Sequence, residues 1–209
     1  MPIRCIVFDF DGTLVDSNHI KKNGFFDILA DDHNGIRIMQ QVYTHNPGDR
    51  YLIWNKYAEL MGKTSEYAAL CVQAYNAHVD NEVIKSSSIP DAEMVLNKLR
   101  DKGLSIFLSS ATPLRNLLQI INARNWNHYF NGIYGTPDTK IETLKTKILP
   151  LVNSPSEIIV VGDGEDDKTS SDQTGCHFIP VGKNFTIRNK NYCGSMKEVM
   201  KYIIEEQYD

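Results

Sequence analysis

Short apolar runs recur along the chain, and each has the length of a buried β-strand. They occupy residues 3–10, 104–110, 157–163 and 176–182. Nearly continuous apolar runs of this length are typical of strands that are covered on both faces, as in a parallel sheet. Between them, segments 91–103, 113–125 and 140–149 carry apolar residues at helical spacing. This alternation predicts an α/β fold in three layers, with helices on both faces of a parallel sheet.

The segment between the first apolar run and the others has a different pattern. From residue 18 to residue 88 it contains no strand-like run. Its apolar residues fall on two helical stripes, which are Tyr51, Trp54, Ala58 and Met61, and then Ala68, Cys71, Tyr75 and Val79. We therefore predict an all-helical domain over residues 17–88, inserted into a core formed by residues 1–16 and 89–209. Segment 85–90, KSSSIP, has the composition of a returning linker.

The overall composition fits one globular core with an insertion. The chain has 209 residues, of which 42% are hydrophobic and 23% are charged, and its formal net charge is -4. This charge, with basic residues spread along the chain, argues against a nucleic-acid partner. No apolar run approaches the roughly 20 residues that cross a bilayer, and the N-terminal segment lacks the pattern of a signal peptide. We therefore expect a cytoplasmic protein with no membrane partner.

The cysteines add no metal site to this description. They are Cys5, Cys71, Cys176 and Cys193, and their spacing matches no common set of metal ligands. In a cytoplasmic protein such residues are expected to be reduced thiols.

Acidic and hydroxyl side chains stand at the ends of three apolar runs. Asp9 and Asp11 end the first run, Ser109 and Ser110 end the second, and Asp163, Asp166 and Asp167 follow the third. Lys140 stands at the start of a predicted helix. Because ligands of open α/β sheets bind at the carboxyl ends of the strands, we expect these side chains to meet in one cleft.

Carboxylates that converge in this way repel one another, so either protonation or a bound cation must compensate. Hard oxygen ligands around an open site suit Mg²⁺, which keeps several waters and takes a phosphate oxygen as a further ligand. A lysine and a hydroxyl in the same cleft suit the other phosphoryl oxygens. A carboxylate held beside a phosphate can attack phosphorus and form an acyl phosphate. The residues therefore predict a Mg²⁺ site for small phosphate esters, with one aspartate placed as a nucleophile.

Four ordered motifs carry a resemblance to a known family. They are DFDGTLVDS from residue 9, FLSSATP from residue 107, Lys140 within GTPDTKIETL, and VVGDGEDD from residue 160. Together they resemble the haloacid dehalogenase superfamily in its phosphatase branch, which includes phosphoglycolate phosphatases and beta-phosphoglucomutase-like proteins. The helical segment is similar to the cap that this family inserts after its first motif. The resemblance covers nearly the whole chain and implies a Rossmann-like catalytic core with a helical cap.

The resemblance also implies roles for the acids. Asp9 is the nucleophile that becomes an aspartyl phosphate, and Asp11 protonates the leaving oxygen and then activates water. The carboxylates of Asp9 and Asp163 bind Mg²⁺ together with the main-chain carbonyl of Asp11. Asp167 supports the metal, through water, or orients Lys140.

The remaining motif residues are expected to hold the phosphoryl group. The resemblance implies that Ser109 donates a hydrogen bond to it and that Lys140 neutralises its charge. Gly12, Thr13 and Ser110 are further candidates for substrate binding.

Several of these residues also have ordinary structural explanations. Asp163 can cap a helix, and an acid in the first turn of a helix, such as Asp167, is favoured by the helix dipole. Asp166 competes with Asp167 for the supporting role, although the spacing from Asp163 favours Asp167. Lys145 and Lys147 compete with Lys140, but their positions are typical of a solvated helix face.

Caps in this family close over the cleft and select the leaving group. Candidate contacts in the predicted helical domain are Asn18, Lys21, His45 and Arg50. The expected substrate is a small phosphorylated metabolite such as a sugar phosphate, and the oligomeric state, monomer or dimer, stays open.

The motifs predict a phosphoric monoester hydrolase and leave several rivals. A sugar-phosphate mutase would use the same residues and return the phosphoryl group to a bound sugar. A dehalogenase would lack the second aspartate, whereas Asp11 is present. A phosphonatase would need a cap lysine placed to form a Schiff base, and none is evident in the sequence. A catalytically silent phosphate-binding module would be expected to lack Asp9 or Asp11, and both are intact.

Overall fold

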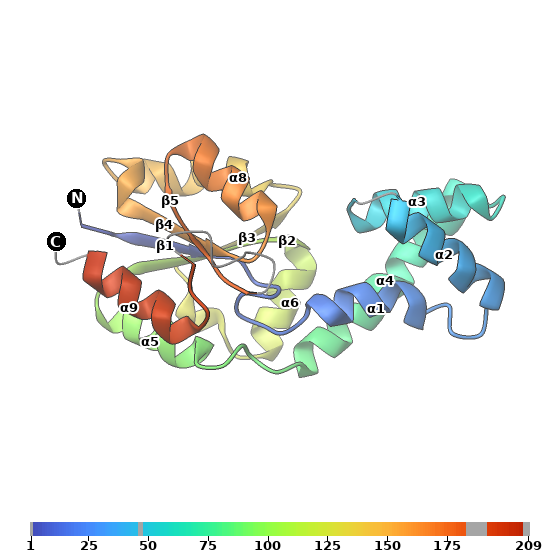
Figure 1. The fold of residues 1–209 in the computed structure, drawn as a ribbon, viewed down its shortest axis with the longest axis horizontal. Helices are drawn as coiled ribbons and strands as arrows, with labels where there is room; N and C mark the ends of the chain where they lie inside the picture. Colours follow the sequence, from blue (N-terminus) through green and yellow to red (C-terminus); the bar gives the residue numbers. More distant parts are fainter. Residues whose placement is uncertain (1, 46–47, 183–191, 207–209) are drawn as a thin grey trace. The chain divides into compact units, whose positions relative to one another are not determined.

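The core is a parallel sheet, as predicted. The computed structural model describes residues 2–45, 48–182 and 192–206, and in them five strands pair in the order β3-β2-β1-β4-β5 (Figure 1). Their bounds are Cys5–Phe8 (β1), Ser105–Pro113 (β2), Gly132–Thr136 (β3), Ile158–Gly162 (β4) and His177–Pro180 (β5). All neighbouring strands run parallel. The predicted α/β fold is therefore confirmed.

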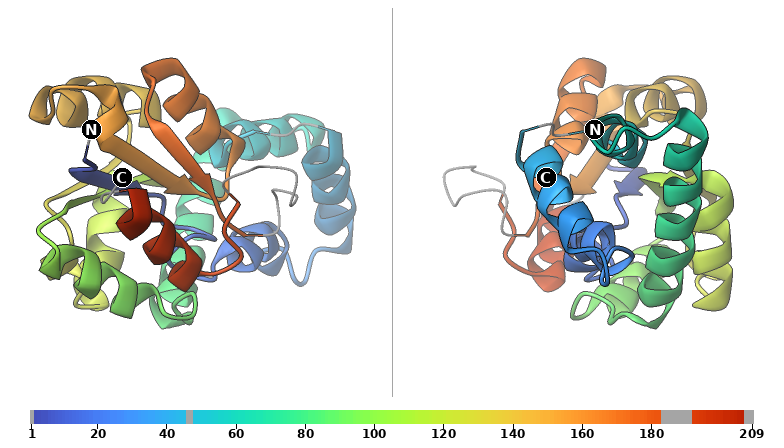
Figure 2. Two further views of the ribbon diagram at one scale, coloured as in Figure 1. Left: turned by 60° about the vertical axis from the view of Figure 1, so that its left-hand side comes forward. Right: turned by 90° about the vertical axis from the view of Figure 1, so that its right-hand side faces the viewer.

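Helices cover both faces of this sheet. The α-helices of the core are α5 (Ala92–Asp101), α6 (Leu114–Ala123), α7 (Lys140–Thr143), α8 (Glu165–Thr174) and α9 (Met196–Glu206). Figures 1 and 2 show α8, in orange, over one face and α5 and α9, in green and red, over the other. Short turns of other helix types occupy Asn127–Tyr129, Leu144–Ile148, Leu149–Leu151 and Pro155–Glu157. The helices predicted at 91–103 and 113–125 are present, whereas the one predicted at 140–149 changes from α-helix to π-helix at Leu144.

The segment predicted to be helical contains α1 (Asn18–Asp27), α2 (His33–His45), α3 (Arg50–Leu60) and α4 (Ser65–Lys85). The chain divides into two compact units, one made of Met1–Asp16 with Ser86–Asp209 and the other of Ser17–Lys85. Aromatic rings fill the centre of the helical unit, where Phe25 lies 4.4 Å from Tyr75 and 5.7 Å from Trp54 between ring centroids. Of the stripe predicted on α3, Trp54 and Ala58 are buried, together with Ile53 and Tyr57. Tyr51, in the first turn of the helix, is instead exposed.

Across residues 2–45, 48–182 and 192–206, no helix combines the length and the apolar character that a membrane span requires. The cytoplasmic location stays a prediction.

The register of the sheet brings three strand ends to one place. Phe8, the last residue of β1, pairs with Leu108 on β2 and with Val161 on β4. The strand β1 lies between these two strands, so the chain order along the sheet reverses beside it. Such a switch point at the carboxyl ends is where open α/β sheets bind ligands. The side chains that follow β1, β2 and β4 therefore meet at this edge.

Candidate active site

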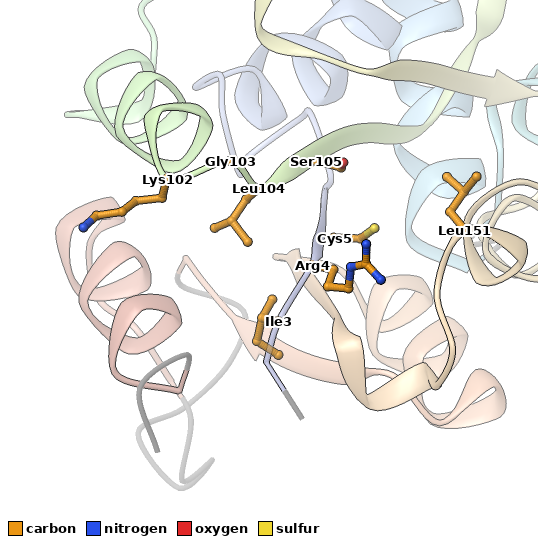
Figure 3. Close-up of a pocket in the computed structure, with 8 residues that line it drawn as sticks. All are labelled: Ile3, Arg4, Cys5, Lys102, Gly103, Leu104, Ser105 and Leu151. Carbon is orange, nitrogen blue, oxygen red and sulfur yellow. The ribbon is translucent and has the colours of Figure 1, made fainter.

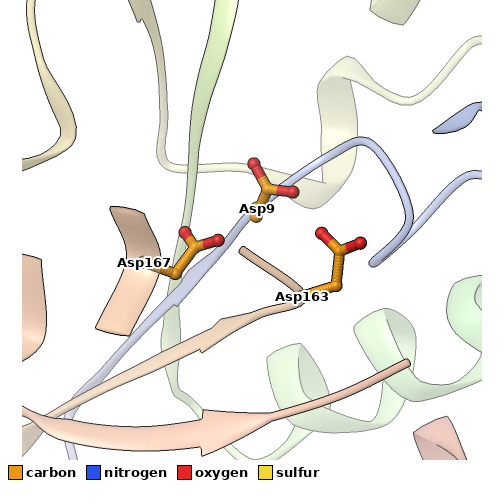
Figure 4. Close-up of side chains that lie close together, drawn as sticks. All are labelled: Asp9, Asp163 and Asp167. Carbon is orange, nitrogen blue, oxygen red and sulfur yellow. The ribbon is translucent and has the colours of Figure 1, made fainter. Parts of the chain in front are cut away.

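Three buried carboxylates gather at the carboxyl edge of the sheet. Asp9 follows β1, Asp163 follows β4, and Asp167 lies in the first turn of α8. Each offers an oxygen that lies within 4.8 Å of an oxygen of the other two (Figure 4). Their residues are only 5%, 7% and 1% exposed, respectively. Carboxylates this close and this buried require a compensating positive charge.

Lys140 supplies part of that charge. Its Nζ lies 3.0 Å from Asp9 Oδ1, 2.7 Å from Asp167 Oδ1 and 2.9 Å from Asp166 Oδ2. Lys140 is the first residue of α7, and Thr139 precedes it as the N-cap, whose hydroxyl accepts a hydrogen bond from a main-chain N–H of the first turn. The cap fixes where the helix begins and hence where the lysine starts. The structure therefore selects Lys140 for this site, and Lys145 and Lys147 are exposed on the π-helical turn.

Burial and charge act together on the pKa values of this cluster. Burial raises the pKa of the Asp9 carboxyl above its usual value, and the ammonium of Lys140 opposes that effect only in part. Burial likewise raises the pKa of Asp167 well above its usual value, and the charge of Asp9 adds to it. For Lys140, burial lowers the pKa, but the carboxylates outweigh it and the pKa is raised overall. One lysine does not satisfy these acids, so the donor set fits a hard divalent cation.

Close packing against glycine distinguishes Asp167 from Asp166. A Cβ added at Gly162 would collide with the carboxyl group of Asp167, so only glycine lets this side chain lie against the end of β4. The N–H of Gly164 donates to Asp167 Oδ2 at 3.2 Å. Asp166 also contacts Lys140, but its side chain is 57% exposed. Asp167 is therefore the buried member of the pair.

The second aspartate of the first motif is held by hydroxyl groups. Thr112 Oγ1 donates to Asp11 Oδ2 at 3.1 Å, and Ser110 Oγ donates to the same oxygen at 3.4 Å. The first aspartate of the motif also receives a hydroxyl group, because Thr13 Oγ1 donates a hydrogen bond to Asp9 Oδ2 at 3.4 Å. Gly12 directly follows Asp11 and has a φ of 78°, a conformation that favours glycine.

The structure brings Ser110, rather than Ser109, to Asp11. Successive side chains of a strand point to opposite faces, so two neighbouring serines cannot both face the cleft. Ser109 is buried on the strand and pairs in register with Tyr134, whereas Ser110 lies where the register with β3 shifts. The phosphate-binding role that the resemblance implies for Ser109 stays a prediction, and Ser110 is the serine that contacts Asp11. In the sequence, the apolar run is followed by both serines, and nothing in it indicates which of them the register shift directs toward Asp11.

Sequence reasoning did not assign a role to Thr112. This residue is 2% exposed and its hydroxyl contacts Asp11. The only signal in the sequence is a third hydroxyl residue within SSATP, two positions after Ser110.

The candidate residues of the helical unit lie on its first three helices. Asn18 and Lys21 lie on α1, and Tyr75 Oη donates to the main-chain oxygen of Lys21 at 2.9 Å. His45 ends α2, with its Nδ1 2.9 Å from the main-chain oxygen of Gln41. Their part in substrate binding stays a prediction.

Arg50, the fourth candidate of the helical unit, is the first residue of α3. Its Nη1 donates to Asn76 Oδ1 at 2.6 Å, and its guanidinium carbon lies 5.6 Å from the centre of the Tyr75 ring. A role in substrate binding stays a prediction for this residue too.

A hollow of about 190 Å³ lies at the opposite end of the strands (Figure 3). It is lined by Ile3, Arg4, Cys5, Lys102, Gly103, Leu104, Ser105 and Leu151. All of them except Leu151, which belongs to the turn Leu149–Leu151, stand at the amino ends of β1 and β2. None of the candidate site residues is among them, so the hollow is separate from the carboxylate cluster.

The fold and the cluster define an α/β protein with an acidic, lysine-containing site at the carboxyl edge of a parallel sheet. The profile of the haloacid dehalogenase-like hydrolase family matches residues 6–181, which span every motif of this site. The chain therefore belongs to the haloacid dehalogenase-like hydrolases, and the expected family is confirmed. No sequence among curated proteins matches the chain.

Several solved structures share the fold over nearly the whole chain. The hydrolase YfnB from Bacillus subtilis, solved with magnesium, has a TM-score of 0.74 at 13% identity and covers 98% of this chain and 100% of its own. A predicted phosphoglycolate phosphatase from Haemophilus somnus has a TM-score of 0.73 at 18% identity, with coverages of 96% and 97%. A protein assigned as a beta-phosphoglucomutase from Thermotoga maritima has a TM-score of 0.73 at 16% identity, with coverages of 97% and 99%.

Proposed function

We propose that this hydrolase is a Mg²⁺-dependent phosphatase that cleaves a small phosphorylated metabolite through an aspartyl phosphate. The observation that carries the proposal is the position of Asp9, buried at the end of β1 within 3.0 Å of the Lys140 ammonium and beside Asp163 and Asp167. A carboxylate beside an ammonium group and a metal site is close to the positive charges that stabilise a phosphoryl group during its transfer. The family match supports hydrolysis, and the phosphatase named among its structural neighbours agrees with this substrate class.

The metal would be held by this chain's oxygen ligands. In the proposal, carboxylate oxygens of Asp9 and Asp163 and the main-chain carbonyl of Asp11 bind Mg²⁺, and Asp167 holds Lys140 at 2.7 Å. When bound, the cation would neutralise charge on the phosphoryl oxygens and on the nucleophile. The neighbour that was solved with magnesium is consistent with this choice of metal.

The chemistry would use the two acids of the first motif in turn. An oxygen of Asp9 attacks phosphorus, the new O–P bond forms, and the ester P–O bond breaks with its electron pair on the leaving oxygen. Asp11 gives its proton to that oxygen and becomes a carboxylate. Water then attacks phosphorus and passes a proton to Asp11, and the Asp9 carboxylate leaves. Phosphate and an alcohol are released, and both acids return to their first state.

The phosphoryl oxygens would be held by groups that surround Asp9. Ser110 donates its hydroxyl hydrogen to one of them, and Lys140 places its charge beside another. The loop that contains Gly12 and Thr13 follows Asp11 directly and borders this part of the site. In the proposal, the helical unit is the cap, and Asn18, Lys21, His45 and Arg50 contact the leaving group.

A second candidate is a sugar-phosphate mutase that uses the same residues. The structural neighbour assigned as a beta-phosphoglucomutase supports it. In that reaction the aspartyl phosphate passes its phosphoryl group to a hydroxyl of a bound sugar phosphate instead of to water.

The experiment is a measurement of phosphate release from phosphorylated sugars and other small metabolites, with Mg²⁺ and with a chelator. The wild type is compared with Asp9→Asn and with Asp172→Asn, whose exposed carboxylate pairs with Lys168 on α8. We expect turnover that needs Mg²⁺, is lost in Asp9→Asn and is kept in Asp172→Asn. An isomerised hexose phosphate without phosphate release would favour the mutase. A phosphorylated ligand that binds without any turnover would favour the silent binding module.

A further inference from the structure

One carboxylate oxygen of Asp11 receives two hydroxyl donors. Thr112 Oγ1 lies 3.1 Å and Ser110 Oγ 3.4 Å from Asp11 Oδ2. The two donors are also linked, because the N–H of Thr112 donates to Ser110 Oγ at 3.1 Å. All three residues are buried, with exposed fractions of 9% for Asp11 and 2% for Ser110 and Thr112. This is a local network of hydrogen bonds with the acid of the first motif at its centre.

The fold aims Thr112 at Asp11 through an irregularity of β2. Ser109 pairs with Tyr134 and Pro113 pairs with Thr136, so β2 has additional residues between these two pairs. The additional residues form a bulge, which is a common device for redirecting a side chain. Gly135 lies beneath the bulge, and a Cβ added there would collide with the main-chain oxygen of Thr112. The absence of a side chain at Gly135 therefore lets the backbone of Thr112 lie this close to β3.

The hydrogen bonds also define which oxygen of Asp11 can carry its proton. Both hydroxyl groups donate to Oδ2, and the carbonyl oxygen of a carboxyl group is a better acceptor than its hydroxyl oxygen, so these bonds favour a proton on Oδ1. We infer that Thr112 is a positioning residue, which holds Asp11 with Oδ1 as the oxygen that donates to the leaving group. This inference rests on the proposed phosphatase function.

Ser110 cannot hold Asp11 throughout the reaction. A serine hydroxyl has one hydrogen, so when it donates to a phosphoryl oxygen it no longer donates to Asp11. The N–H of Thr112 occupies a lone pair of Ser110 Oγ in either case, and it thus fixes the directions left to that hydrogen. Thr112 Oγ1 stays on Asp11 Oδ2 when Ser110 turns to the substrate. Thr112 therefore keeps the acid in place during cleavage of the ester bond.

This role affects the transfer of one proton. As the ester P–O bond breaks, the O–H bond of Asp11 Oδ1 breaks and its proton passes to the leaving oxygen, which becomes an alcohol. An alkoxide is a poor leaving group and needs that proton, whereas a nitrophenolate leaves readily without it. A displaced Asp11 should therefore slow the cleavage of alkyl phosphates much more than that of p-nitrophenyl phosphate.

The experiment compares kcat/KM for the best alkyl phosphate of the metabolite panel and for p-nitrophenyl phosphate, with saturating Mg²⁺. The variants are Thr112→Val, which keeps the shape and loses the hydroxyl, and Thr112→Ser, which keeps the hydroxyl. We expect Thr112→Val to lower kcat/KM for the alkyl ester by about tenfold or more, as general acid catalysis contributes on the order of 10²–10⁴-fold. The value for p-nitrophenyl phosphate should change by less than about threefold, and Thr112→Ser should restore most of the loss.

Other outcomes overturn the inference. Equal losses for the two esters in Thr112→Val, at an unchanged melting temperature, would show that Thr112 serves packing alone. Failure of Thr112→Ser to restore activity would also contradict it. If Thr112→Val does not fold, Thr112→Ala undergoes the same comparison. A wild-type protein that hydrolyses neither ester nor any metabolite of the panel would overturn the proposed function itself, which is a different result.

Discussion

The ammonium of Lys140 donates a hydrogen bond to Asp9 Oδ1 at 3.0 Å, although 131 positions separate the two residues in the chain. Asp9 follows the central strand β1, and Lys140 begins α7, which comes after the edge strand β3 in the chain. Their contact places a cation against the proposed nucleophile. It also affects stability, because removal of either residue leaves the charge of the other buried and unpaired.

The first prediction concerns Lys140→Met in the presence of a chelator. The variant leaves Asp9 and Asp167 buried without their shared cation, so the free energy of unfolding should fall by about 3–5 kcal/mol at neutral pH. Urea unfolding, followed by circular dichroism, measures this change. Lys147→Met, on an exposed position of the neighbouring π-helical turn, should leave the free energy of unfolding nearly unchanged.

The effect of Lys140→Met should also depend on pH. Burial raises the pKa of Asp9 and Asp167 in the folded protein, so the folded state binds protons more tightly than the unfolded state. Such groups cost stability as the pH rises above the unfolded value of about 4. Loss of the lysine raises both pKa values further, so the deficit of the variant should grow from acid to neutral pH. A deficit that stays constant with pH would show that the two carboxylates are not its cause.

A second prediction concerns the metal. Mg²⁺ that binds only the folded protein should stabilise it by about 2.7 kcal/mol at a concentration of about 100 times the dissociation constant. Asp163→Asn should remove most of this stabilisation, because it removes one carboxylate of the cluster. Asp172→Asn, the exposed control on α8, should keep it. Thermal unfolding at increasing Mg²⁺ measures the effect, and equal stabilisation of both variants would exclude Asp163 as a ligand.

The close approach of Asp167 to Gly162 gives a third prediction. Gly162→Ala should push the Asp167 carboxylate away from Lys140, because the new Cβ would occupy its place. We expect a loss of about 1–3 kcal/mol in the free energy of unfolding, as is typical of an overfilled core, together with a lower kcat. Gly194→Ala is the matched control, because a Cβ there meets its nearest atom at an ordinary 3.5 Å. An unchanged kcat in Gly162→Ala would argue against a role for Asp167.

Much of the sheet could be predicted from the sequence. The runs that contain β1, β2, β4 and β5 are apolar because parallel strands are covered on both faces. The acids at the ends of these runs stand out for the same reason, because charged side chains are rare within a strand that is buried on both faces. By contrast, β3 has the sequence GIYGT, which contains two glycines and no long apolar run, so its pattern does not indicate a strand.

The details of the site could not be predicted in the same way. Whether Ser109 or Ser110 faces Asp11 depends on where β2 shifts its register against β3, which is a tertiary property. The role of Thr112 depends on the same shift and on the space above Gly135. The spacing from Asp163 favours Asp167 over Asp166, but that Asp167 is the buried acid, packed against Gly162, is seen only in the structure.

The central claim is that Asp9 carries the phosphoryl group, and trapping of the intermediate tests it most directly. The enzyme is quenched during turnover and treated with sodium borohydride, which reduces an acyl phosphate to an alcohol and converts a phosphorylated aspartate to homoserine. Peptide mass spectrometry then locates the altered residue. We predict homoserine at position 9, only when substrate is present, and none in Asp9→Asn. An active enzyme that shows no reduction at position 9, or shows it at Asp11 instead, would contradict the account.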